Sequence, residues 1–217
     1  MRLIESKFPL IEINVLAEYE SSFLKMIPRE TKRKLMQLLE IEEAKGVNLP
    51  KLNNLLYYPA RIPLTATRAV TLASLLNDSI IGSEFLKAIG LSKLSNLVKT
   101  SKKLATLFMV NPEHELVAKL VGDEPKKFIV VDPMAGGGSI PLEAKRLGFT
   151  VIVGDYNPVS YLLLRATIEF PAKYGMRLYE LVNEEAKKLI NYVKAELSKY
   201  YSQDGTEILF VSAEHDC

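Results

Sequence analysis

Residues 130–158 constrain the fold more than any other part of the chain. This segment begins within the run Phe128–Val131, which consists of four consecutive apolar residues, three of them β-branched. Such a run predicts a strand that is covered on both faces. A Gly-rich turn follows at 136–138, then a helix that closes at Gly148, then a second apolar run at 149–153. Strand, turn, helix and strand in this order predict a parallel α/β sheet.

Two acidic side chains stand where these strands are expected to end. Asp132 follows the first strand, and Asp155 follows the second, 23 residues later. Ligands of open α/β sheets bind at the carboxyl ends of the strands, where an acid on the second strand meets the ribose of a nucleotide-like cofactor. The glycines let the backbone approach a ligand closely, and the helix start presents free N–H groups. The segment therefore predicts a cofactor site.

The charge at the first strand tip indicates the class of cofactor. A pyrophosphate site favours Gly-x-Gly-x-x-Gly without an acid, whereas this chain has Asp-Pro-Met-Ala-Gly-Gly-Gly. A carboxylate there attracts a cation, and S-adenosylmethionine carries a sulfonium, an ammonium and a ribose that needs a second acid. We therefore expect S-adenosylmethionine rather than NAD. An alternative stays open, in which Asp132-Pro133 only starts a turn and Asp155 only caps a helix.

The rest of the chain predicts two unlike parts. Residues 1–122 are expected to be mostly helical, and residues 123–217 to form a cofactor-binding portion with an incomplete sheet. Expected helices lie at 29–45, 64–76, 83–89 and 92–108, a further helix is capped by Asn111 and ended by Gly122, and a long helix carries an apolar stripe from Leu178 to Tyr200. Thr206–Ser212 is expected to be a third strand.

Composition excludes several classes of protein. With 25% charged and 48% hydrophobic residues among 217, the chain has the make-up of a globular protein. No apolar run approaches the roughly 20 residues that span a bilayer, and Glu5 and Lys7 interrupt any signal peptide, so we expect a cytoplasmic protein. A single cysteine, Cys217, excludes an internal disulfide, two histidines exclude a site of several histidines, and no metal site is expected.

Basic residues gather in two places although the net charge is only +2. The first group contains Lys25, Arg29, Lys32, Arg33 and Lys34, and the second contains Lys93, Lys99, Lys102 and Lys103. Both groups fit solvated helix faces, and both also fit contacts with nucleic-acid phosphates.

The segments DPMAGGGSIPLEAKRLG and GDYNPVSYLLLRATIEFP resemble the cofactor half of amino-methylating DNA methyltransferases. The chain is most similar to the adenine-specific DNA methylase family with a DUF1156 N-terminal region, whose start resembles RLIESKFPLIEIN and whose aromatic pair resembles the one in NLLYYPARIPLTATRAV. The resemblance covers most of residues 1–172 in pieces, and it is specific around 130–158 and looser before residue 77. It implies a Rossmann-like fold that binds S-adenosylmethionine.

The resemblance also implies a role for each site residue. Asp132, followed by Pro133, would contact the methionine amino group, and Ala135, Gly136 and Gly138 would form the floor under the methionine and ribose. Asp155 would accept hydrogen bonds from the ribose hydroxyls, Tyr156 would lie along the adenine, and Asn157 would hold the loop or touch the cofactor. Tyr58, Pro59 and Arg61 would close the site, with Arg61 paired either to the cofactor carboxylate or to a surface acid.

The chain departs from the family in one important respect. These enzymes clamp the flipped base with an Asn/Asp/Ser-Pro-Pro-aromatic motif, and this chain contains no Pro-Pro. Met134 also replaces the usual Phe of the first motif. The expected protein is thus the cofactor-binding part of a split or truncated DNA (adenine-N6) methyltransferase that binds DNA through basic helices. A second polypeptide would carry the catalytic half, no catalytic residue is assigned, and the chain alone would be inactive. A non-catalytic scaffold subunit is the alternative.

Overall fold

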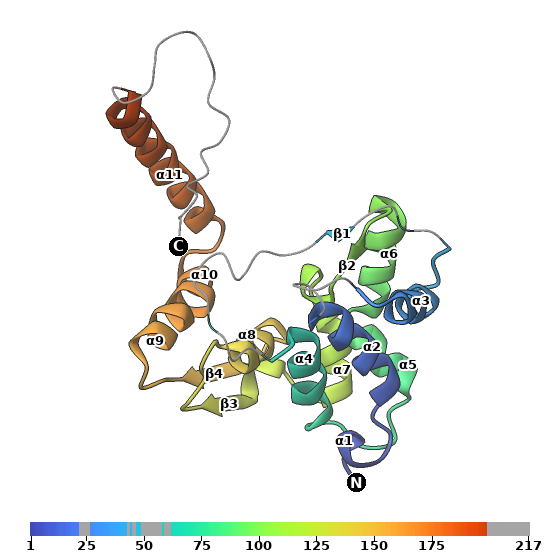
Figure 1. Cartoon of the computed structure of the whole chain (residues 1–217). Coiled ribbons are helices and arrows are strands. Elements are labelled where there is room, and N and C mark those ends of the chain that lie inside the picture. Colours follow the sequence, from blue (N-terminus) through green and yellow to red (C-terminus); the bar gives the residue numbers. More distant parts are fainter. Residues whose placement is uncertain (22–26, 43, 45–46, 49–57, 59–61, 199–217) are drawn as a thin grey trace, which may run out of the picture. The chain divides into compact units, whose positions relative to one another are not determined.

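The structure, a computed structural model, describes residues 1–21, 27–42, 44, 47–48, 58 and 62–198 (Figure 1). The chain divides into two compact units, Met1–Glu169 and Phe170–Cys217. Lys25, Pro59, Arg61 and the expected strand Thr206–Ser212 lie outside the described residues. In the described part the fold is mostly helical with small parallel strand pairs, which is compatible with the α/β class.

The first unit contains nine α-helices and four strands among its described residues. In chain order they are α1 (Leu3–Ser6), α2 (Leu10–Ser21), α3 (Arg29–Leu38), β1 (Val47–Asn48), α4 (Leu64–Ala73), α5 (Gly82–Ala88), α6 (Leu91–Ser101), β2 (Leu104–Ala105), α7 (His114–Val121), β3 (Ile129–Asp132), α8 (Ser139–Arg146), β4 (Thr150–Val153) and α9 (Pro158–Leu164). A π-helical turn, Arg165–Glu169, follows α9.

The positions of the helices agree with the sequence better than their ends do. The helix expected at 29–45 ends at Leu38, because the chain leaves the helical conformation at Glu40, which is left-handed with φ of 53°. The helix expected at 92–108 ends at Ser101, where Lys102 is left-handed in the same way. Gly122 ends α7 as predicted, but the prediction for Asn111 is wrong, because Glu113 stands at the N-cap and Asn111 accepts a hydrogen bond from Arg146.

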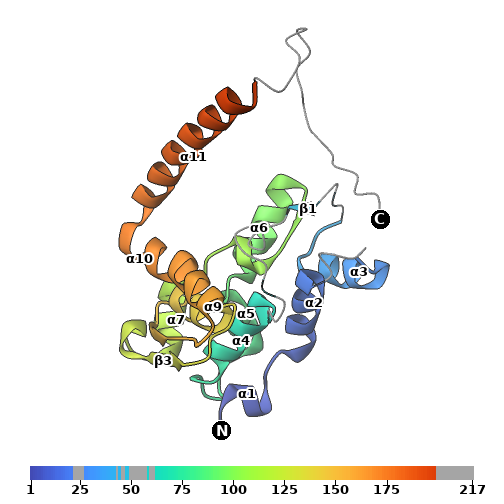
Figure 2. The ribbon, with the colours of Figure 1, turned by 60° about the vertical axis from the view of Figure 1, so that its left-hand side comes forward.

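The strands after residue 122 form a parallel pair. β3 and β4 pair in register from Ile129 opposite Thr150 to Asp132 opposite Val153. Their carboxyl ends therefore meet at one edge of the sheet, as the sequence predicts. A second, shorter parallel pair joins β1 to β2. Figure 2 shows β3 on the far side of α4 from α2.

The prediction that these strands are covered on both faces is wrong for the described residues. Side chains on one face of β3 and β4 are more than half exposed: Ile129 at 59%, Val131 at 62% and Ile152 at 57%. The alternate residues Val130 and Val151 pack against the hydrophobic core instead. The apolar run thus follows the period-two alternation of a strand with one covered face.

One hydrophobic core runs through the first unit. It begins in α1 and α2, includes Leu72 of α4 and Phe85 of α5, and continues to Ala144 and Phe149 beside the β3–β4 pair. The boundary predicted at residues 122 and 123 falls inside this unit, directly after α7. The helical N-terminal region and the strand pair therefore share a core, and their functional division stays a prediction.

A buried ion pair joins the helical region to the strand pair. Arg68 of α4 and Glu143 of α8 are both fully buried, and the Arg68 Nε donates to Glu143 Oε2. The Arg68 Nη1 donates to the carbonyls of Ile89, Leu107 and Val110. Burial lowers the pKa of Arg68, and the Glu143 carboxylate opposes that shift. Helix α8, which follows the Gly-rich turn, is in this way fixed against α4.

The second unit is described as two helices, α10 (Phe170–Tyr174) and α11 (Met176–Leu197). The long helix with an apolar stripe is confirmed up to Leu197, although no residue of α11 is buried and Val182 and Leu189 are 60% and 62% exposed. Across the residues that the structure describes, no helix combines the length and the apolar character that crossing a membrane requires.

Candidate cofactor site

The candidate site lies at the carboxyl edge of the β3–β4 pair, where the two acids identified in the sequence are found. The Asp132 carbonyl accepts a hydrogen bond from the Gly154 N–H at 3.1 Å, and the Gly154 carbonyl accepts from the Ala135 N–H at 3.1 Å. These bonds extend the pairing of the strands into the two loops that follow them. The Gly-rich turn and the loop at Asp155 are thereby held side by side.

Glycine is required twice in the turn before α8. Gly136 and Gly138 have φ angles of 54° and 77°, in the left-handed region that L-residues adopt at a cost. A Cβ on Gly136 would lie 3.2 Å from the Tyr58 hydroxyl oxygen, and one on Gly138 would lie 3.0 Å from Leu164 Cδ2. The turn is therefore tightly packed on both sides, against Tyr58 and against α9.

Asp155 joins the two loops through both of its oxygens. Oδ2 accepts from the Gly136 N–H at 2.7 Å, and Oδ1 accepts from the Asn157 N–H at 2.8 Å. These backbone donors stabilise the ionised form, so the pKa of Asp155 is lowered, with the Asn157 bond as the largest cause. A carboxylate has about four lone-pair sites, so acceptor capacity is left for a ligand hydroxyl.

The sequence left open that Asp132 only starts a turn and that Asp155 only caps a helix, and the structure shows a turn at Asp132 but a different cap for the helix. Asp132 Oδ1 accepts from the Met134 N–H at 3.3 Å, which is the geometry of a turn starter, and Oδ2 accepts no hydrogen bond from the described residues. The capping alternative for Asp155 is wrong, because Asn157 caps α9 by accepting from the Val159 N–H at 2.9 Å. Asn157 thus holds the loop, which is one of the two roles expected of it.

The aromatic residues of the expected site lie in unlike surroundings. Tyr58 is half-buried and contacts the Gly-rich turn although it is 78 residues away in sequence. Tyr156 is 100% exposed at the tip of the loop, beside the exposed Pro133 and the half-buried Ala135. Nine of the eleven expected site residues thus belong to these two loops or contact them, and the other two, Pro59 and Arg61, lie outside the described part of the chain.

Sequence reasoning missed the residues that position the turn. Leu164 and Ile168 lie under Gly138, at 3.0 Å and 3.8 Å from a Cβ placed there. Arg68 and Glu143 fix the helix that the turn begins. A signal for Arg68 was present, because it is the one charged residue in the apolar helix segment LTATRAVTLASLL, and a charge in a buried helix needs a partner.

This arrangement is suited to a ligand that combines positive charge with hydroxyl groups. Two carboxylates lie at one edge, beside the backbone of the Gly-rich turn. The described residues contain no group of three or more His, Cys, Asp and Glu side chains placed to hold a metal ion. Comparison with protein-family models, curated proteins and solved structures finds no match to this chain.

Proposed function

We propose that this chain is the S-adenosylmethionine-binding portion of a Rossmann-like DNA (adenine-N6) methyltransferase. The observation that carries the proposal is the edge where Asp132, the Gly-rich turn and Asp155 meet, with the Gly136 N–H bonded to Asp155. The resemblance of the same segment to amino-methylating DNA methyltransferases supports the choice of cofactor. These 217 residues contain no Pro-Pro, so the catalytic and target-recognition half of a split or truncated enzyme would lie elsewhere, as in a second polypeptide.

The residues present fit this cofactor. Asp132 has an oxygen free of hydrogen bonds from the described residues, which suits the cofactor ammonium, and Asp155 has lone pairs for the ribose hydroxyls. The Gly-rich turn lies beside Asp155, where the methionine and ribose portions are proposed to bind, and the exposed Tyr156 is available to the adenine. Bound S-adenosylmethionine supplies an activated methyl group, and this chain's part is to bind and orient it.

Calorimetric titration with S-adenosylmethionine tests the proposal. We expect saturable binding that is at least about tenfold weaker in Asp155→Ala. The substitution removes the acceptor of the hydrogen bonds that join the two loops and of the proposed hydrogen bond from the ribose. Asp123→Ala is the matched control, since Asp123 is an aspartate of the same unit that pairs with Lys127 away from the strand tips. NAD is the control ligand. No binding by the folded chain, or equal losses in the two variants, would contradict the proposal.

The exposed sheet face favours a second candidate function, a non-catalytic subunit that binds a partner. Ile129, Val131 and Ile152 expose apolar surface, and a groove of about 530 Å³ runs between β3 and α4, lined by Ile62, Val70 and Ile140 among others. Surface of this kind marks an interaction site. The same titration separates the candidates, because a scaffold that has lost the cofactor would not bind S-adenosylmethionine.

A further inference from the structure

The strongest concentration of unneutralised charge in the described residues lies on α3. This helix carries Arg29, Lys32, Arg33 and Lys34 against the single acid Glu30, a net charge of +3, which exceeds the +2 of the whole chain. Lys34 is neutralised by Glu30, with its Nζ 2.8 Å from the Glu30 carboxylate. Arg29, Lys32 and Arg33 form no ion pair with a described carboxylate. We call these three residues the α3 cations.

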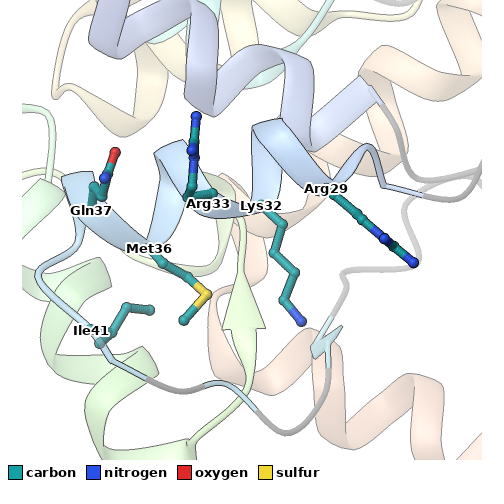
Figure 3. A pocket seen from close by; sticks show the side chains of 6 residues that line it. All are labelled: Arg29, Lys32, Arg33, Met36, Gln37 and Ile41. Atoms are coloured by element: carbon teal, nitrogen blue, oxygen red, sulfur yellow. The ribbon is translucent and has the colours of Figure 1, made fainter.

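The α3 cations line a groove with an apolar floor. The groove has a volume of about 340 Å³ and is lined by Arg29, Lys32, Arg33, Met36, Gln37 and Ile41. Figure 3 shows Lys32 and Met36 on the same side of the helix, with Ile41 facing Met36, while Arg33 and Gln37 point to another side. The groove therefore lies on the exposed face of α3, between the row of Lys32 and Met36 and the row of Arg33 and Gln37.

The helix is also held firmly enough to present these charges in a fixed arrangement. Thr31 and Leu35 on its inner side are buried, and α3 packs against α2. The α3 cations are exposed at the surface. The one-turn spacing between Arg29 and Arg33 is about 6 Å along the axis. The positive charge is therefore displayed by a packed helix.

We propose that the groove on α3 binds the phosphate backbone of double-stranded DNA. Duplex DNA carries one negative charge per about 1.7 Å of its axis, so a ten-residue helix about 15 Å long can oppose several phosphates. Arginine pairs with phosphate through two parallel hydrogen bonds, and the floor of Met36 and Ile41 suits the apolar edge of deoxyribose. The choice of DNA among polyanions rests on the proposed function.

Fluorescence anisotropy of a labelled duplex, measured over a range of salt concentrations, tests this inference. The variant Arg29→Gln/Lys32→Gln/Arg33→Gln should bind at least about tenfold more weakly and lower the slope of log K against log salt by about 2 to 3, which is roughly 0.9 per lost phosphate contact. All three positions are exposed, so we expect an unchanged melting temperature.

The matched control changes the net charge equally at three scattered positions. Lys87 of α5, Lys119 of α7 and Lys145 of α8 are exposed and form no ion pair with a described residue. Lys87→Gln/Lys119→Gln/Lys145→Gln should keep most of the affinity and of the salt slope. Equal losses in both variants, or no binding of the duplex by the unaltered chain, would overturn the inference.

Two further measurements distinguish DNA binding from membrane binding and from the proposed cofactor binding. Binding to anionic lipid vesicles that depends on the α3 cations, without dependent binding to DNA, would reassign the groove to a membrane surface and overturn the inference. Titration of the α3 variant with S-adenosylmethionine should give unchanged affinity. If neither the unaltered chain nor any variant binds S-adenosylmethionine, while DNA binding still depends on the α3 cations, the proposed function is contradicted and the inference about α3 is kept.

Discussion

At the scale of single residues, both the backbone conformation and the packing at Gly136 favour glycine. Its φ of 54° costs an L-residue about 1–2 kcal/mol, and a Cβ there would meet Tyr58 at 3.2 Å. Gly122 is a natural control, because its φ of 74° is similar and no atom lies within 4 Å of a Cβ. We expect Gly136→Ala and Gly122→Ala both to destabilise the fold in urea titrations, and only Gly136→Ala to weaken S-adenosylmethionine binding. Equal cofactor affinity in both variants would contradict the placement of the site.

The hydrogen bonds to Asp155 make a prediction about pH. The pKa of this carboxyl is lowered in the folded chain from its usual 3.8, so the ionised form stabilises the fold. That contribution is present above pH 3.8 and is lost as the pH falls through the folded value. The difference in unfolding free energy between the unaltered chain and Asp155→Asn should therefore shrink in acid, as measured by denaturant titrations at neutral and acidic pH. A difference in unfolding free energy that stays constant with pH would contradict this role of the Asp155 carboxylate.

The buried pair Arg68–Glu143 predicts strong coupling between α4 and α8. Glu143→Leu leaves the Arg68 guanidinium in the core without a counterion and should cost about 3–5 kcal/mol of unfolding free energy. Arg68→Met should cost less, because Glu143 keeps an ion pair with Arg146 Nη1 at 2.8 Å. The double variant should cost clearly less than the two single changes together, and a double-mutant cycle in denaturant measures this coupling. Additive costs would show that the pair does not act as a unit.

At the scale of elements, the two faces of β3 predict opposite responses to the same substitution. Val130→Thr places a hydroxyl against the hydrophobic core and should cost about 1 kcal/mol or more, whereas Val131→Thr on the open face should stay within about 0.5 kcal/mol. The neighbouring positions share one strand, so each variant controls for the other. A large cost at Val131 would indicate that a further segment covers this face.

The sequence predicts the order of the elements around the candidate site, but it does not predict where some of the helices end. The strands, the turn and α8 follow from local signals, since apolar runs, positive-φ glycines and Gly148 at the helix end act within a few residues. The end of α3 does not, because Leu39 is buried in the core and its carbonyl accepts a hydrogen bond from Ser95, 56 positions away. The open face of β3 was missed for the same reason.

At the scale of the whole molecule, the first unit connects the helical region to the candidate site through one core. The sequence predicted the two acids and the glycines of that site, which are close along the chain. The resemblance assigned Tyr58 to the site, but no local pattern predicted its contact with Gly136 or the role of Arg68 in holding α8, since these contacts join residues more than 70 positions apart. We propose that this edge of the β3–β4 pair, where these contacts meet, binds S-adenosylmethionine.

Amide chemical shifts recorded by NMR during a titration with S-adenosylmethionine test that claim most directly. The N–H groups of Gly136 and Asn157 report on the site because both donate to Asp155. We predict saturable shifts at Gly136, at Gly138 and along residues 155–157, with Gly122 unchanged. Saturable shifts confined to other parts of the chain, or a spectrum of a folded protein that does not change, would contradict the claim.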